Sequence, residues 1–409
     1  MGKSNLRKIA PKVVHVFPEC RPGGGPAGYC FNLLQGLSLL GSQESLKVLF
    51  PNTNTRRASK VSRKFELLQS LPSCLSGFLV FVRTLMILQD AFRYFGFTEE
   101  QIDEIKTSDV VVFHDYRLAS AYLLNLNKSS NQKIIIMPHA PTDLSAEIIE
   151  NWKLYLGNSR IWNIIYRSLA ERELRTLLSA NSLLIPCRYA LDGYFTSMPE
   201  RVSLFQLPFY ELPSGVRPLI ATQSPYKVRA SWGVDSNKKI VGFFGRKHPH
   251  KGYDIFCQAA EVAYRHKLDI VFVSAGSGPV SSPLHLPNFL DLGYLTTELA
   301  DAIAAVDLVI VPNRVCYFDL VILEAMSLGK PVLTTPVGGS RCLNSPGIFF
   351  VNDLSAENLM MAINELLSKS KSDLEEAGRL NVEVFEDMYS LQPFARRHLE
   401  FAKLIKEIL

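Results

Sequence analysis

The chain has 409 residues, of which 47% are hydrophobic and 20% are charged, and its formal net charge is +5. This composition excludes a disordered or collagen-like chain, and the length suits about two to three domains of ordinary size. The small positive charge fits an anionic partner, but without a basic tail it does not indicate nucleic-acid binding.

Seven cysteines are spread along the chain without a C-x-x-C motif. Their odd number and wide spacing indicate neither a disulfide scaffold nor a zinc site, so we expect a reducing, cytoplasmic environment. The N-terminus, MGKSNLRKIAPK, is polar and lacks the apolar core of a signal peptide. No apolar run approaches the roughly 20 residues that a membrane-spanning helix needs.

Short apolar runs alternate with helical patterns along the first half of the chain. They are rich in Val, Ile and Phe and end at Gly, Pro or polar residues, which is typical of buried parallel strands. The runs are Val13–Phe17, Leu46–Phe50, Val110–Phe113, Lys133–Met137 and Ser182–Pro186.

A second series of the same kind follows in the second half. Its runs are Ile240–Gly245, Asp269–Ser274, Leu308–Pro312, Pro331–Thr335 and Ile348–Val351.

The strand–helix–strand order of both halves predicts an α/β fold of two doubly wound, Rossmann-like domains. Prolines and glycines cluster between Leu207 and Pro225, which divides the chain into domains over 1–214 and 215–391. The amphipathic end, 392–409, predicts a terminal helix that packs back on the first domain. We expect the domains to face a central cleft, where ligands bind beyond the carboxyl ends of the strands.

A basic loop follows the first strand of the second half. Arg246 and Lys251 stand five residues apart, just before a helix that begins near Asp254. A guanidinium fork and an ammonium group are suited to hold a diphosphate, while the alternative is a solvated basic turn. After the next strand, Gly276 either lets the backbone approach a ligand or only makes a turn.

Glu324 lies in the helical segment between the strands LVIVP and PVLTT. A carboxylate can accept hydrogen bonds from both hydroxyls of a ribose, while the alternative is a glutamate on a helix surface. The sequence has no D-x-D motif and no cluster with metal-ligand spacing, so we expect no metal.

Four sequence blocks occur in the order and at the separations seen in the glycogen-synthase-like, retaining GT-B glycosyltransferases of family 4. They are GFFGRKHPHKGYDIF, VSAGSGP, LGYLTTELADAIAAVDLVIVPN and FDLVILEAMSLGKPVLTTPVGG. The chain resembles this family most strongly from about Val241 to Gly339. The resemblance implies metal-independent, retaining transfer from a UDP- or GDP-linked sugar, with no cofactor besides this donor.

The family pattern implies roles for individual residues of this sequence. Arg246 and Lys251 would bind the donor's pyrophosphate, and Glu324 would bind the ribose. Leu320 and Val321 would place their backbone N–H groups near the phosphates, at the N-terminus of a helix.

The sequence departs from the family at several positions. The first glutamate of the family's E-x7-E pattern falls at Cys316, and the glycine that usually follows the phenylalanine is Asp319. Asp319 lies one helical turn away and is the candidate to replace the missing carboxylate in catalysis. Cys342 stands where many members carry another glutamate. These departures bear on catalysis more than on the fold or on nucleotide binding.

A glycine-rich loop follows the first strand. Gly23, Gly25 and Gly28 match G-x-G-x-x-G, but five residues separate the motif from the strand, and no acidic residue ends the second strand. Both points argue against a nicotinamide dehydrogenase. The resemblance instead implies that Gly24 and Gly25 approach the donor phosphates and the acceptor; a plain loop is the alternative.

His114 and His139 each follow a predicted strand and therefore lie at the carboxyl edge of the first sheet. A histidine at a strand end is often structural. The family has a histidine near the transferred sugar that matches His114, which implies that His114 positions the sugar or donates a hydrogen bond to it during catalysis.

Five basic residues with no acidic residue among them lie between Arg56 and Lys64, and the apolar run 71–89 follows. This pattern predicts a membrane-surface face over 56–89, at the inner face of the membrane; a buried helix with a solvated loop is the alternative.

Taken together, the sequence predicts a cytoplasmic, peripheral-membrane glycosyltransferase of polysaccharide biosynthesis. Its partners would be a nucleotide-sugar donor and a glycan or lipid-linked acceptor, without nucleic acid. The alternative is a non-catalytic GT-B protein that binds or stabilises a partner glycosyltransferase, and Cys316 motivates it.

Overall fold

The computed structural model describes residues 12–51, 75, 78, 97–125, 131–146, 149–150, 153, 161–197, 203–204 and 206–408. The chain divides into two compact units, each with its own six-stranded sheet. The first unit consists of Met1–Ile185, Tyr194–Leu212 and Ala395–Leu409, and the second of Pro186–Gly193 and Pro213–Phe394. The predicted α/β fold of two doubly wound sheets is confirmed.

The first sheet has the strand order β2-β1-β3-β4-β5-β6, and all of its neighbouring strands run parallel. Its central strands are buried on both faces, as the continuous Val and Ile runs require. The strands are β1 (Val13–Val16), β2 (Lys47–Leu49), β3 (Val110–Phe113), β4 (Lys133–Ile136), β5 (Ser182–Ile185) and β6 (Phe209–Glu211).

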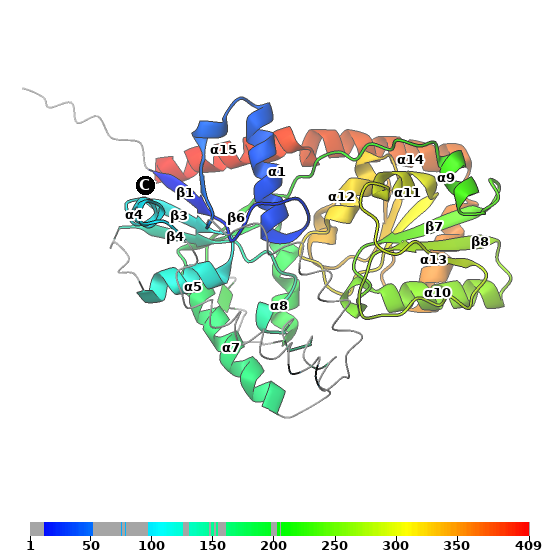
Figure 1. Cartoon of the computed structure of the whole chain (residues 1–409), viewed down its shortest axis with the longest axis horizontal. Helices are drawn as coiled ribbons and strands as arrows, with labels where there is room; N and C mark the ends of the chain where they lie inside the picture. Colours follow the sequence, from blue (N-terminus) through cyan, green and yellow to red (C-terminus); the bar gives the residue numbers. More distant parts are fainter. Residues whose placement is uncertain are drawn as a thin grey trace, which may run out of the picture. The chain divides into compact units, whose positions relative to one another are not determined.

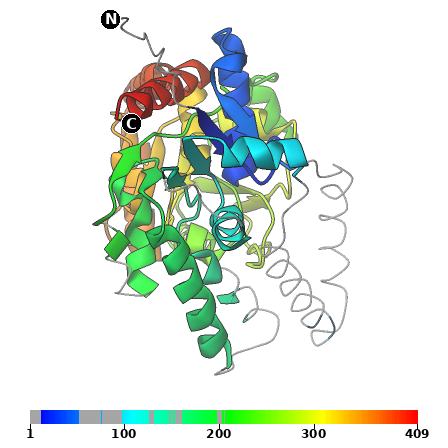
Figure 2. The same cartoon turned by 90° about the vertical axis from the view of Figure 1, so that its left-hand side faces the viewer.

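Helices cover both faces of this sheet. In Figure 1 and Figure 2, α5 and α7 lie on one face, and α1 and α15 lie on the other. The bounds are α1 (Gly25–Leu39), α4 (Glu99–Lys106), α5 (Tyr116–Asn125), α7 (Ile161–Leu178), α8 (Asp192–Ser197) and α15 (Leu391–Ile408).

The last helix, α15, packs on the first unit through aromatic and polar contacts. The Tyr29 hydroxyl on α1 lies 2.8 Å from Nε2 of His398. The Phe401 ring meets Tyr210 of β6 edge-on, with the ring centroids 5.1 Å apart. Residues 395–409 therefore belong to the first unit, although the chain reaches them from the second.

The second sheet has the strand order β12-β11-β10-β7-β8-β9, again with parallel neighbours. Its strands are β7 (Lys239–Phe244), β8 (Ile270–Ala275), β9 (Phe289–Asp291), β10 (Leu308–Val311), β11 (Val332–Thr334) and β12 (Ile348–Phe350).

Two helical layers enclose the second sheet. Helices α10 and α13 lie on one face, and α11, α12 and α14 lie on the other (Figure 1). Tyr253, Phe256 and Phe272 are fully buried in the core under α10. The bounds are α9 (Pro225–Ser231), α10 (Tyr253–Arg265), α11 (Leu299–Ala305), α12 (Leu320–Ser327), α13 (Ala356–Ser368) and α14 (Lys371–Val384).

Two edge strands, β6 and β9, were not among the predicted runs. Each has three residues, and β6 is buried at none of them. A strand at a sheet edge has one covered side, so it needs no continuous apolar run, and the pattern that marks a central strand is missing.

No helix within the described ranges is both long enough and apolar enough to cross a membrane. The predicted membrane face, 56–89, lies outside the described residues except for Leu75 and Phe78, and it stays a prediction.

Candidate functional site

The loop after β7 carries the predicted phosphate-binding residues. Arg246 is exposed just beyond the strand, and Lys251 ends a short 3-10 helix, Pro249–Lys251, that precedes α10. Between them, Lys247 has a structural role, because its Nζ lies 2.5 Å from the Asp291 carboxylate and its side chain is only 8% exposed. The sequence pattern alone does not tell which of these three cations has a structural role, whereas the burial of their side chains does.

Two glycines allow the backbone of this loop to pack closely. Gly252 has φ +67°, and a Cβ atom there would lie 1.8 Å from the Pro312 carbonyl oxygen. Gly276 has φ +137°, and its Cβ atom would lie 1.8 Å from the Gly245 carbonyl oxygen. Any side chain at either position would collide with backbone, so both glycines fix the shape of the loop. The predicted ligand contact of Gly276 stays a prediction.

Asp319 caps helix α12 and contacts Lys251 in the loop after β7. Its Oδ1 accepts a 3.4 Å hydrogen bond from the Val321 backbone N–H, and its Oδ2 lies 2.5 Å from Lys251 Nζ. Asn313 Nδ2 donates to the same Oδ2 at 2.8 Å. The helix N-terminus, with Leu320 and Val321 in its first turn, thus lies beside Lys251, and the contact of their N–H groups with phosphate stays a prediction.

The charges of Lys251 and Asp319 stabilise each other. Burial opposes the charged form of Lys251, but Asp319, with a further contribution from Cys316, outweighs it and raises the pKa of the ammonium. Burial likewise opposes ionisation of Asp319, yet Lys251 and the bond from Asn313 hold the pKa of its carboxyl below the usual range. Lys251, which the family resemblance implied as one of two phosphate-binding cations, is therefore one half of an ion pair with Asp319.

Glu324 lies on α12, one turn beyond Asp319. Burial, and secondly the charge of Asp319, raise the pKa of its carboxyl to about 7. A carboxyl that titrates near neutral pH is a common feature of functional sites. Glu324 is therefore coupled to Asp319, the residue that caps the same helix.

Cys316 interacts with the ion pair of Lys251 and Asp319. The side chain is 4% exposed, and burial raises the pKa of the thiol, with a further contribution from Asp319. The Cys316 carbonyl accepts a 3.2 Å hydrogen bond from the Gly339 N–H. At neutral pH the position where the family has a carboxylate therefore holds a neutral, buried group.

The glycine loop of the first unit ends at the N-terminus of α1. Gly24 is the N-cap residue without a side-chain cap, Pro26 stands in the first turn, and no acidic residue occupies that turn. Gly24 and Gly25 are exposed, and a Cβ atom at either would meet nothing within 4 Å. The uncapped N–H groups are suited to meet an anion; the assignment of the two glycines to the donor stays a prediction.

His114 lies inside the first unit rather than on its surface. Its ring is 0% exposed and stacks on Phe17 with the centroids 3.7 Å apart. One ring nitrogen, Nε2, lies 2.9 Å from Nδ1 of His15, and the other, Nδ1, lies 2.9 Å from Nε2 of His139. Both nitrogens of the predicted catalytic residue are therefore occupied by other histidines.

His139 is the part of this histidine chain that reaches the surface. It is partly exposed after β4 and has a left-handed backbone, with φ 56°. Burial lowers the pKa of His139 to about 3, against the opposing effect of Asp115. A positive φ at a non-glycine residue is uncommon and concentrates at functional sites. The sequence offered one signal for His139, its place at a strand end.

Asp115 and Arg117 flank the same edge of the first sheet. The Asp115 carboxylate accepts from the Arg117 side chain through both oxygens, and Arg117 N donates to Oδ1 at 2.7 Å. The Tyr116 hydroxyl lies in the field of Glu173, and burial raises its pKa above the usual range. This polar group was not predicted as a site, although Asp115, Tyr116 and Arg117 are consecutive in the sequence; only Glu173 comes from a distant segment.

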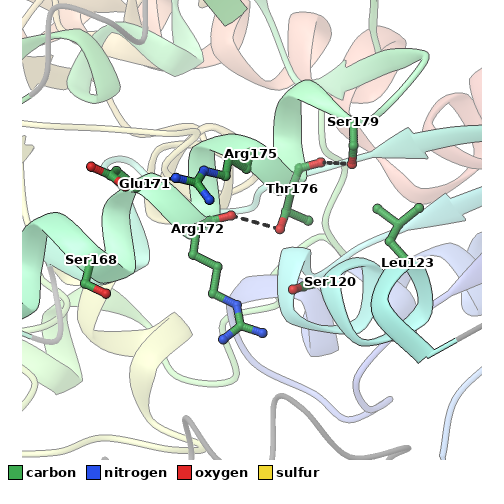
Figure 3. A pocket seen from close by; sticks show the side chains of 8 residues that line it. All are labelled: Ser120, Leu123, Ser168, Glu171, Arg172, Arg175, Thr176 and Ser179. Carbon is green, nitrogen blue, oxygen red and sulfur yellow. Dashed lines mark hydrogen bonds and ion pairs between the residues drawn. The ribbon is translucent and has the colours of Figure 1, made fainter.

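A separate hollow of about 470 Å³ lies between α5 and α7, away from the residues predicted for the site. Figure 3 shows Arg175 turned toward Glu171, with which it forms a 3.2 Å ion pair, while Arg172 extends along the hollow toward Ser120. Within the described part of the chain, no group of three or more His, Cys, Asp or Glu side chains could hold a metal ion.

Comparison with known proteins finds a family match over the region of the second sheet. Residues 238–369 match the model of the glycosyl transferases group 1 family. Over 129 residues the chain is 36% identical to a D-inositol 3-phosphate glycosyltransferase of Gordonia bronchialis, covering 27% of this chain and 28% of that protein. The enzyme of the same name from Mycolicibacterium smegmatis is 34% identical over 135 residues, or 29% of this chain and 30% of its own. These matches thus span less than a third of the relatives' length.

Solved structures resemble the chain over almost its whole length. Sucrose-phosphate synthase from Thermosynechococcus elongatus superposes with a TM-score of 0.60 at 14% identity, covering 98% of this chain and all of that one. Anabaena HepE, crystallised with UDP and glucose, gives a TM-score of 0.57 at 16% identity, with 96% and 99% coverage. Residues 238–369 therefore resemble the glycosyl transferases group 1 family, and the chain as a whole has the two-sheet fold of these solved structures.

Proposed function

We propose that this chain transfers a sugar from a nucleotide diphosphate sugar to a glycan or lipid-linked acceptor, with retention of configuration and without a metal ion. The observation that carries the proposal is the cluster at the carboxyl end of the second sheet. There Arg246, Lys251 and the N-terminus of α12 supply positive charge, and Glu324 supplies a carboxyl group one turn further on.

The donor's diphosphate would bind to Arg246, Lys251 and the first N–H groups of α12. Each charge-assisted hydrogen bond of this kind contributes about 1.5–3 kcal/mol. A helix N-terminus adds partial positive charge at the same place. Together these groups would neutralise the leaving diphosphate in the role that a metal ion has in other transferases.

Glu324 would hold the ribose through two hydrogen bonds from its hydroxyls. The base is proposed to be uracil or guanine, and the UDP bound to HepE supports uracil. The departing diphosphate would take the acceptor's proton, so a strong protein base is not required. Gly24 and Gly25 are proposed, on the family resemblance, to contact the phosphates and the acceptor.

The proposal also includes catalytic roles for His114 and Asp319, each of which would act through a neighbouring residue. His114 would act through His139, since both of its ring nitrogens are occupied. Asp319 would act on Lys251, with which it forms an ion pair. A cytoplasmic location, a membrane face over 56–89 and a role in polysaccharide synthesis are proposed as well, on the sequence pattern alone.

One observation favours a second candidate function, a non-catalytic protein that stabilises a partner glycosyltransferase. The buried thiol of Cys316 cannot supply the negative charge that the family's carboxylate would bring to the transferred sugar.

The experiment is a screen of UDP- and GDP-linked sugars for binding by calorimetry and for nucleotide release with a panel of acceptors. Binding of one nucleotide sugar and acceptor-dependent release are expected. If no nucleotide binds at millimolar concentration, the proposed donor site is wrong.

A further inference from the structure

The contact between Lys251 and Asp319 has a direct bearing on how the site treats anions. The proposed phosphate ligand, Lys251, is already neutralised by a carboxylate 2.5 Å away. That carboxylate stands at the position where the resemblance implied a glycine. A diphosphate that enters the site therefore finds Lys251, one of its proposed ligands, already paired with the Asp319 carboxylate.

Asp319 is held firmly in this position. Its Oδ2 accepts from Lys251 and from Asn313, and Oδ1 caps α12 through the Val321 N–H. Asn313 is 0% exposed, and the Asp319 side chain is 10% exposed. Three hydrogen bonds from three segments mean that the ion pair is built into the fold and is not a chance encounter of two surface side chains.

We propose that Asp319 is an internal counter-anion for Lys251, which the donor's diphosphate must displace, so that Asp319 weakens nucleotide binding and speeds release of the nucleoside diphosphate product. The inference rests on the proposed function, because it takes the loop of Lys251 as the diphosphate site. It goes beyond the proposed function because it names Asp319 as a residue that sets the affinity of this site for the diphosphate.

The charges around Lys251 support this role. Asp319, the Cys316 thiol and Arg246 all act on the ammonium, and among these Asp319 is the carboxylate. The Cys316 thiol is held neutral by burial. When a diphosphate replaces Asp319 as the partner of Lys251, the carboxylate is left close to another anion, and this repulsion lowers the affinity.

The pKa of Glu324 depends on the charge of Asp319. Burial and the Asp319 carboxylate together hold its pKa at about 7. Removing the negative charge at Asp319 should therefore lower the pKa of Glu324, because only the burial contribution remains. The pH at which nucleotide binding half-titrates then moves down, and this shift reports that the Asp319 charge has been removed from the site.

The test compares the wild-type chain with Asp319→Asn by calorimetry, with inorganic pyrophosphate and UDP as separate ligands. The asparagine keeps an oxygen that can cap α12 but removes the charge. We expect both ligands to bind about tenfold more tightly to the variant, and stopped-flow dissociation of UDP to slow by a similar factor. In a Lys251→Ala background the gain from Asp319→Asn should be clearly smaller.

Asp254→Asn is the matched control. The Asp254 carboxylate pairs with Arg314 at 2.7 Å beside the same loop. The substitution therefore removes one negative charge and leaves the ion pair of Lys251 with Asp319 intact. UDP affinity should change by less than about twofold. Asp319→Ser, a second good helix cap, serves if the asparagine variant does not fold.

The outcomes separate this inference from the proposed function. Unchanged or weaker binding of both ligands to the folded Asp319 variants overturns the counter-anion role. Reduced turnover with unchanged UDP affinity also overturns it, in favour of a catalytic role for Asp319. Tighter pyrophosphate binding by a chain that binds neither UDP nor GDP supports the counter-anion and contradicts the proposed function.

Discussion

The Nδ1 atom of His114 lies 2.9 Å from the Nε2 atom of His139. His15 occupies the other nitrogen of His114, and His15 Nε2 has no hydrogen-bond partner among the described residues. A buried lone pair without a partner costs less than a buried N–H without one. This favours a proton on Nδ1 of His15, which makes His114 donate to His139 and places the proton of His139 on its own Nδ1.

We predict that His139→Ala lowers sugar transfer at least as much as His114→Ala does, by about a hundredfold. The reason is that His139 is the partly exposed member, while His114 orients it from the interior. The measurement is kcat and KM for donor and acceptor, with exposed His266→Ala as the control. Full activity of His139→Ala with loss in His114→Ala would return the catalytic role to His114.

Acid should destabilise the first unit through the same histidines. Burial lowers the pKa of His15 to about 3 and that of His114 well below its ordinary value of 6.5. The unfolded chain then binds more protons below pH 6.5, so the free energy of unfolding falls as the pH drops from about 6.5 toward 3. Each such histidine contributes on the order of 1 kcal/mol per pH unit.

Hydrogen exchange of the β1 and β3 amides between pH 7 and 5, corrected for the intrinsic rates, measures this effect locally. His15→Phe should reduce the pH dependence, and exposed His266→Gln should leave it unchanged. A pH dependence that is identical in all three proteins contradicts the prediction.

The fold could be predicted from the sequence because buried parallel strands impose continuous apolar runs, which Val110–Phe113 and Leu308–Val311 show plainly. The edge strand Phe209–Glu211 lacked that signal. In the site, the spacing of Arg246 and Lys251 predicted a basic loop. The contact of Lys251 with Asp319 depends on tertiary structure over 68 positions, and no local pattern encodes it.

Two neighbouring cations, Arg246 and Lys247, give a contrast between binding and stability. Arg246→Ala should weaken UDP binding by about ten- to a hundredfold and leave thermal unfolding unchanged, because Arg246 is exposed. Lys247→Ala should lower the free energy of unfolding by about 3 kcal/mol, because it removes the cationic partner of the half-buried Asp291 carboxylate. Calorimetry and thermal unfolding of both variants check the division, and equal effects of the two substitutions on both properties contradict it.

Glu324 should make donor binding depend on pH. The ionised carboxylate is the stronger acceptor for ribose hydroxyls, and its pKa is about 7. Affinity for UDP-glucose should therefore rise with pH through about 7 and fall by up to about tenfold per pH unit below it. UDP-glucose is the suitable ligand because its diphosphate does not titrate in this range.

Glu324→Gln should bind UDP-glucose with little pH dependence and should lose far less affinity for pyrophosphate than for the nucleotide sugar. Equal losses for both ligands would place Glu324 away from the ribose.

The last prediction concerns Cys316 and decides between an enzyme and a non-catalytic partner protein. The family's carboxylate at this position would stabilise charge on the sugar as its bond to phosphate breaks, and here the group is a neutral, buried thiol. If the chain is active by other means, Cys316→Ala should keep at least about a third of the turnover, because the thiol contributes no charge to the transition state. We expect this outcome, since Arg246, Lys251 and Glu324 keep the residue types that the family resemblance implies for the proposed donor site. Cys316→Ser is the matched control for the thiol's size and polarity.

Nucleotide release is measured for each protein with a panel of nucleotide sugars and acceptors. Tight UDP binding without release from any donor–acceptor pair, together with co-purification of a second glycosyltransferase that loses stability when this chain is removed, would establish the non-catalytic alternative instead.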